Sequence, residues 1–135
     1  MTKVSKASAA QHWSVEGRFD SAVAEVDGSS IEFLSCDVDF DLAFVHKGQP
    51  NDQCQASHVG YVVKGKLTVH RADGTGTVFE GGDAFVITPG HVLSAATLSE
   101  FVVFTPIEQA RAQAAVVEAN MKRYAADHYG IEASG

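Results

Sequence analysis

The sequence predicts an all-β fold, a small antiparallel β-barrel followed by one C-terminal α-helix. Three observations lead to this prediction. With 135 residues and 45% hydrophobic content, the chain is long enough to bury one core. Short apolar runs separated by turn residues fill residues 21–105, and regularly spaced short strands favour a barrel or sandwich. Beyond residue 105 the apolar spacing becomes helical.

These patterns divide the chain into three segments. Residues 1–20 form an N-terminal arm that packs through Trp13 and Phe19, because its other residues are mostly small or polar. Residues 21–105 form the barrel, with turns where Gly, Asp, Ser and Pro gather. Residues 106–130 form the helix. The strands expected within the barrel are SAVAEV, IEFLSCDVDF, LAFVH, SHVGYVVKG, KLTVHR, TVFE, DAFVITP, VLSAAT and EFVVFTP.

The helix has a clear start signal and one apolar face. Thr105 is expected as the N-cap, Pro106 as the first helical residue, and Glu108 as the residue that completes a Thr-x-x-Glu capping box. Gly130 suits the end of the helix. The arm and the apolar helix face need surfaces to cover, on the barrel or on a second subunit, so we expect a homodimer. The face consists of Ile107, Ala110, Ala114, Val117, Met121, Tyr124 and His128.

Charge and composition argue against several classes of function. A formal net charge of -7 without any Lys/Arg run makes nucleic acid and anionic membrane surfaces poor partners. No apolar stretch approaches ~20 residues, and the N-terminal segment lacks the apolar core of a signal peptide, so we expect a cytoplasmic protein. Two cysteines are too few for a disulfide scaffold. We expect Cys36 and Cys54 to be thiols, one in the core and the other a ligand.

Candidate ligands gather around the central strands. Asp52, Cys54 and His58 occupy even positions just ahead of the run GYVVKGKLTVH. Because successive side chains of a strand alternate between faces, all three point the same way if this run is extended. After a Gly-rich turn region the chain returns through GGDAFVITPGH and adds His91. Two separate segments are therefore expected to deliver polar side chains into one cavity.

The same region resembles the cupin superfamily, in particular its small single-domain members. The run YVVKGKLTV is similar to the family's strand-Gly-strand element, and GTVFEGGDAFVITPG is similar to its Gly-Asp, apolar strand, Pro-Gly element. Together these runs and their flanks cover residues 53–105, in the order and spacing of the family. The resemblance implies a cupin-type barrel, also called a double-stranded β-helix or jelly roll, whose mouth holds one small molecule.

The metal-binding motif departs from the usual family pattern at every ligand position. Where many cupins read His-x-His-x-x-x-Glu, residues 52–58 of this chain read Asp-x-Cys-x-x-x-His. In the second motif the usual histidine position holds Leu93, and His91 stands two residues earlier with the same parity. A subset of small cupins carries a similar Cys-x-x-x-His-x-Gly-Tyr run with a Pro-Gly-His turn, so the departure resembles a variant pattern.

Two functions fit this set of residues. In the first, Cys54, His58 and His91 hold a divalent metal, zinc or iron, and Asp52 is a fourth ligand or the general base. By resemblance, the protein is then a metal-dependent enzyme that oxygenates, isomerises, cyclises or decarboxylates a small organic molecule. In the second, the cysteine and histidines are members of an apolar cavity, and the barrel binds or senses a small molecule without metal or catalysis.

Other candidates carry weaker signals. His46, near the end of a strand-like run, is a reserve ligand, although an isolated histidine there is more often at the surface. His70 has the opposite parity to its apolar neighbours and is expected to face solvent. Gly60 either leaves room for a ligand or marks a strand irregularity. Covalent hydrolysis through Cys54 is not expected, since no strand-turn-helix nucleophile signature is present.

Overall fold

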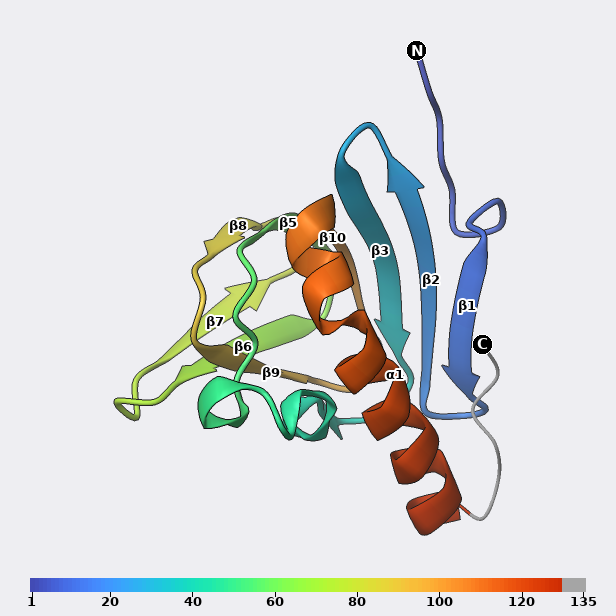
Figure 1. Cartoon of the computed structure of the whole chain (residues 1–135). Coiled ribbons are helices and arrows are strands. Elements are labelled where there is room, and N and C mark those ends of the chain that lie inside the picture. The colour runs from blue at the N-terminus through green and yellow to red at the C-terminus, as the bar shows by residue number, and fades with distance from the viewer. Residues whose placement is uncertain (130–135) are drawn as a thin grey trace.

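The computed structural model describes residues 1–129, which form two antiparallel β-sheets and one long C-terminal helix (Figure 1). This architecture confirms the predicted all-β fold with a C-terminal helix. The larger sheet has the order β1 (Gln11–Val15), β2 (Phe19–Val26), β3 (Ser29–Cys36), β10 (Ser99–Pro106), β5 (His58–Lys64) and β8 (Ala84–Ile87). The smaller sheet has the order β4 (Phe40–Asp41), β9 (His91–Ala95), β6 (Lys66–Arg71) and β7 (Gly76–Glu80).

One main core joins the two sheets, because alternate side chains of each strand point toward it. Val62 and Phe101 come from the larger sheet, Leu67 and Val69 come from the smaller sheet, and each is at most 2% exposed. The chain passes from the larger sheet to the smaller at Gly65, the single residue between β5 and β6. Burial of apolar side chains from both sheets is the main favourable contribution to the stability of this fold.

The prediction of a strand over LAFVH is wrong, because this segment forms a short 3-10 helix, η1 (Ala43–His46). The carboxylate of Asp41 accepts a hydrogen bond from the first N–H of η1 at 2.9 Å, which turns the chain directly after β4. Asn120 of the C-terminal helix donates to the carbonyls of Val45 and Lys47, both at 2.9 Å. These bonds satisfy backbone groups that a strand would have paired with a neighbour.

The C-terminal helix, α1 (Ile107–Tyr129), begins one residue later than the capping box predicts. Thr105 belongs to β10, and its hydroxyl pairs with the imidazole of His58 rather than with the first turn of the helix. The predicted N-cap is therefore wrong, because a partner distant in sequence takes the hydroxyl. Gly130, the predicted end, lies outside the described residues. Within residues 1–129, no helix has the length and apolar character needed to cross a membrane.

Helix α1 runs beside β3 and β10 and contacts η1 (Figure 1). Its predicted apolar face is confirmed in large part, although Ala114 is exposed. Two polar side chains, Gln113 and Asn120, share this inward face with the apolar residues. The members of the predicted face that are buried or half-buried are Ile107, Ala110, Val117, Met121 and Tyr124.

The N-terminal arm packs on its own chain. Its second half is β1, which pairs with β2 at one edge of the larger sheet. Trp13 and Phe19 pack in the main core, as the sequence predicted, while Ala9 packs on Ala22 and Ala24 in a second, smaller cluster. The homodimer stays a prediction. Large apolar side chains that remain exposed on the larger sheet are Val59, Tyr61, Val63, Val86 and Phe104.

Gly65 makes the passage between the two sheets possible. Its φ of 81° lies in the left-handed region that other residues rarely adopt. A Cβ at this position would lie 2.6 Å from the Cα of Ser99 and closer still to its side chain. Ser99 is fully buried, and its hydroxyl accepts a hydrogen bond from the N–H of Lys66 at 2.9 Å. The serine therefore cannot move aside without losing that bond.

We expect Gly65→Ala to lower the free energy of unfolding by about 3 kcal/mol or more, because it combines backbone strain with a buried clash. Gly74→Ala is the matched control, since Gly74 has a φ of 84° but no atom within 4 Å of its added Cβ. The control is expected to cost roughly 1 to 2 kcal/mol, the strain alone. Urea unfolding measures the free energy of unfolding of both variants. An equal loss of stability in the two variants would contradict the close approach of Gly65 to Ser99.

Candidate metal centre

Cys54, His58 and His91 converge at one buried point of the barrel. The sulfur and one nitrogen from each imidazole all lie within 4.8 Å of one another. The three residues are 1%, 9% and 0% exposed, respectively. His58 is the first residue of β5 and His91 is the first residue of β9, so each sheet contributes one histidine. Two separate segments therefore deliver these side chains to one place, as predicted, while the cavity and the metal expected there stay predictions.

A backbone bridge holds Cys54 beside His91. The N–H of Cys54 donates to the carbonyl of His91 at 2.8 Å, and the N–H of Gly90 donates to the carbonyl of Cys54 at 2.8 Å. Gly90 has a φ of 87°, which lets the Pro-Gly turn reverse the chain just before His91. Residues directly opposite in an antiparallel bridge place their side chains on the same side. The bridge therefore brings the thiol and the imidazole together.

The strand parity inferred from the sequence holds from Cys54 onward and fails at Asp52. Even positions of residues 54–62 are buried, and the odd positions between them are more exposed. Asp52 is exposed and lies in a second 3-10 helix, η2 (Pro50–Asp52), with a φ of 53°. Its carboxylate accepts a hydrogen bond from the N–H of Gly48 at 2.9 Å, which closes that turn. The expected shared face is wrong for Asp52, and its role as fourth ligand or general base stays a prediction.

His91 presents a nitrogen that has no partner in the protein. Its Nδ1 lies 2.6 Å from the carbonyl of Thr88, and since a carbonyl only accepts, Nδ1 carries the proton. Nε2 therefore holds a lone pair, and among the described residues it is the one buried side-chain nitrogen or oxygen without a hydrogen bond. An unpaired buried acceptor is unfavourable. A lone pair oriented by a bond at the other ring nitrogen is also what a metal ion binds.

His58 is held in a similar way. Its Nδ1 lies 2.7 Å from the hydroxyl of Thr105, and its Nε2 lies 3.4 Å from the sulfur of Cys54. Burial, reinforced by the neighbouring His91 and His46, lowers the pKa of His58 to about 4. Burial also lowers the pKa of His91. Both imidazoles are therefore neutral at pH 7, which is the form that coordinates a metal.

The chemistry of the three groups suits a zinc or ferrous ion, and the spacing of Cys54 and His58 fits one. At the usual bond lengths, a sulfur and a nitrogen that share a tetrahedral ion lie about 3.5 Å apart. The sulfur of Cys54 and Nε2 of His58 are 3.4 Å apart. One thiolate and two imidazoles leave a coordination position open, as in catalytic rather than structural zinc sites. Burial raises the pKa of the Cys54 thiol, so metal binding must release its proton.

A chain of polar side chains leads from Cys54 to helix α1. Gln113 of α1 lies 3.4 Å from the sulfur through Nε2, and its Oε1 accepts from Gln49 at 3.0 Å. Gln49 in turn pairs with His46 at 2.9 Å. The expectation of a surface position for His46 is wrong, because η1 turns it inward and leaves it 7% exposed. Sequence reasoning missed Gln113, although a glutamine inside an apolar helix face was a usable signal.

Glu32 is a second group that the sequence did not single out. It lies on β3 in register with Val103 of β10, and the protein encloses its carboxyl while part of the side chain stays accessible. Ser21 donates a hydrogen bond to it at 2.5 Å, and no cation of the described residues pairs with it. Burial raises its pKa, with the Ser21 bond opposing. Its charge also raises the pKa of Cys36 and of Cys54, so it acts on both thiols.

Three remaining expectations have clear outcomes. His70 is exposed, as predicted, and its Nε2 lies 2.9 Å from the hydroxyl of Ser94. Cys36 is a free thiol in the main core, where burial raises its pKa to about 12. Gly60 does not leave room for a ligand, because an added Cβ would overlap the carbonyl oxygen of Val102 and the ring of Phe85.

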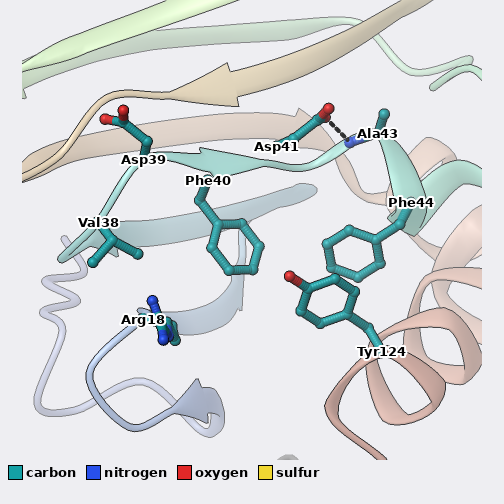
Figure 2. A pocket seen from close by; sticks show the side chains of 8 residues that line it. All are labelled: Arg18, Val38, Asp39, Phe40, Asp41, Ala43, Phe44 and Tyr124. Atoms are coloured by element: carbon teal, nitrogen blue, oxygen red, sulfur yellow. Dashed lines mark hydrogen bonds between the residues drawn. The ribbon is translucent and has the colours of Figure 1, made fainter. Parts of the chain in front are cut away.

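A cavity of about 270 Å³ shares no residue with the three converging side chains. Figure 2 shows the rings of Phe40, Phe44 and Tyr124 grouped beside it, with Asp39 and Asp41 turned away from the rings. Phe44 and Tyr124 stack with their ring centroids 4.1 Å apart. Both carboxylates accept hydrogen bonds from backbone N–H groups of nearby segments, so they have structural roles.

Comparison with solved structures finds several with a similar fold. A variant of the Streptomyces protein PAC13 with uridine matches over 78% of this chain and 82% of its own, with a TM-score of 0.52 and 14% identity. A protein of unknown function from Vibrio parahaemolyticus matches over 70% of this chain and 95% of its own, with a TM-score of 0.50 and 15% identity. An RmlC-like cupin from Shewanella frigidimarina matches over 71% of this chain and 83% of its own, with a TM-score of 0.48 and 17% identity. No protein-family model and no curated protein matches the sequence.

The fold is therefore a small two-sheet antiparallel β fold with a C-terminal helix, similar to the folds of the Streptomyces and Vibrio proteins. It agrees with the barrel architecture that the sequence resemblance implied. At 14% to 17% identity, these likenesses describe the fold and not the ligand or the reaction. The chemistry has to be argued from the side chains of this chain.

Glu32→Gln is expected to stabilise the protein increasingly as pH rises. The pKa of Glu32 is raised in the folded state, so its contribution to stability is fully present below the unfolded value near 4.5 and is lost as pH rises through the folded pKa. Glutamine still accepts the bond from Ser21 and carries no charge to bury. Urea unfolding from about pH 4 to pH 8 measures the effect. A difference from wild type that does not change with pH would contradict the raised pKa.

Proposed function

We propose that this protein is a metal-dependent cupin enzyme that acts on a small organic molecule, with Cys54, His58 and His91 as the metal ligands. The observation that carries the proposal is the buried, unpaired Nε2 of His91 beside the sulfur and the second imidazole. Without an ion this nitrogen is an unfavourable group, and a shared ion would satisfy it. Zinc or iron suits a thiolate and two imidazoles, whereas magnesium and manganese prefer oxygen ligands.

The protein supplies a rigid ligand set and a carboxyl for proton transfer. A bound ion with one open position would polarise a carbonyl or enolate oxygen, which suits isomerisation, cyclisation, decarboxylation or oxygenation. Thr88 and Thr105 hold the two imidazole rings through their Nδ1 atoms. Glu32, whose charge contributes to the raised pKa of Cys54 after burial, is a second candidate beside Asp52 for the group that exchanges a proton with a bound molecule.

A metal-free binding module is the second candidate. The cavity of about 270 Å³ beside the three aromatic rings favours a binding module, because its volume is close to that of small-molecule pockets. This cavity lies apart from Cys54, His58 and His91. The Streptomyces protein with a similar fold holds uridine in its structure, which supports small organic molecules as the ligand class for either candidate. In this second candidate the Cys54 thiol donates to His58, and Nε2 of His91 is left to accept a hydrogen bond from a bound molecule.

Metal binding separates the two candidates. The wild-type protein, produced without a histidine tag and reconstituted with Zn²⁺, is expected to hold about one ion per chain and to unfold at a higher temperature than the chelated protein. The double variant Cys54→Ala with His58→Ala is expected to hold less than ~0.2 ion per chain. His70→Ala is the matched control, because it removes an exposed histidine outside the site. Elemental analysis gives the stoichiometry.

Two outcomes would contradict the metal-dependent function. One is a wild-type protein with less than ~0.2 ion per chain after reconstitution. The other is a double variant that retains as much metal as the wild type and the His70→Ala control, since the ion would then bind elsewhere. Either result would favour the metal-free binding module.

A further inference from the structure

Helix α1 reaches the candidate metal site through the side chain of Gln113. Its Nε2 lies 3.4 Å from the sulfur of Cys54, and its Oε1 lies 3.0 Å from Nε2 of Gln49. Oε1 accepts from Gln49, and Nε2 is the amide atom nearer the sulfur, so the N–H end is the end that donates to it. The opposite arrangement, with the thiol donating to Oε1, has the longer distance of 3.7 Å.

Gln49 is oriented in the same direction. Its Nε2 donates to Gln113, so its Oε1 is left to accept, and the partner is Nδ1 of His46 at 2.9 Å. An amide oxygen cannot donate, so Nδ1 of His46 carries the proton. Three donors therefore point one way, from His46 through Gln49 and Gln113 to Cys54. In such a chain each bond polarises the next donor, which strengthens the last bond.

We propose that Gln113 is a positioning residue for Cys54: its amide N–H holds the sulfur in place and withdraws electron density from it, while Gln49 and His46 keep the amide in this orientation. This inference rests on the proposed metal site. A ligand oriented by a second interaction loses less freedom when the ion binds, and such outer partners commonly change metal affinity by roughly 10- to 100-fold.

Ordinary helix packing does not account for this glutamine. Gln109, one turn earlier on α1, also bonds the barrel, where its Oε1 accepts from the N–H of Ser57 at 2.8 Å. That bond fastens the helix without touching a ligand residue. Gln113 is half-buried whereas Gln109 is exposed, and the sulfur of Cys54 is one of the two partners of Gln113. The two glutamines therefore form a matched pair, one structural and one directed at the site.

Co²⁺ is the probe for this role, because a cobalt–thiolate bond gives a sulfur-to-cobalt charge-transfer band in the absorption spectrum. Loss of a hydrogen bond raises the energy of the sulfur electrons and moves this band to longer wavelength. Gln113→Leu is expected to show that shift and to bind Co²⁺ roughly tenfold more weakly than wild type. The control Gln109→Leu is expected to keep the wild-type band position and affinity.

A second variant guards against a folding defect. Gln113→Glu keeps the size of the side chain and the acceptor for Gln49 but presents no N–H to the sulfur, so the same shift in the band is expected. If wild type binds Co²⁺ with a thiolate band and neither Gln113 variant moves it, the positioning role is overturned while the metal site stands. An equal shift in Gln109→Leu would also overturn it. A wild-type protein that takes up no Co²⁺ overturns both the site and the role.

Discussion

The backbone bridge between Cys54 and His91 is the interaction on which the arrangement of the site depends. Cys54 lies four residues before His58, which begins β5 of the larger sheet, and His91 begins β9 of the smaller sheet. The bridge therefore links the chain that enters one sheet to the first residue of a strand in the other. Once Cys54 is fixed, the alternation of an extended chain places His58 on the same side four residues later. Burial of Val62 further along the same face resists any slip of this register.

Features that follow from local alternation and turn chemistry could be predicted from the sequence. The convergence of Cys54, His58 and His91 is of this kind, whereas the strand-Gly-strand run around Gly65 was marked by its resemblance to the family element. Features decided by distant partners could not. LAFVH reads as a strand, but Asn120, 75 positions away from Val45, holds it in a helical turn. Thr105 reads as a helix cap, but its hydroxyl is taken by His58, 47 positions away. Glu32 stands out only through the groups that surround it in the folded chain, and the partner of Gln113 is Cys54, 59 positions away.

Helix α1 is therefore more than a cover for apolar surface. Along its inward face, Asn120 satisfies backbone carbonyls around η1, and Gln113 reaches the sulfur of Cys54. His46 of η1 pairs with Gln49, Gln49 donates to Gln113, and Gln113 reaches Cys54. The helix, η1 and the ligand set therefore share one hydrogen-bond network. A displacement of the helix would leave several buried polar groups without partners at once, which makes its docking strongly cooperative with the geometry of the site.

The balance between the two candidate functions turns on what each requires of the buried polar groups. Nε2 of His91 has no hydrogen-bond partner within the described chain, and an unpaired buried acceptor costs about 1 to 3 kcal/mol. Glu32 is enclosed in either case, and burial raises its pKa, which favours the uncharged carboxyl. Replacement of His91 by an apolar residue would relieve the cost of its nitrogen in a protein that needed only a pocket. A shared ion would give this nitrogen a partner beside the sulfur of Cys54 and the imidazole of His58, and this is the argument for preferring the metal-dependent candidate.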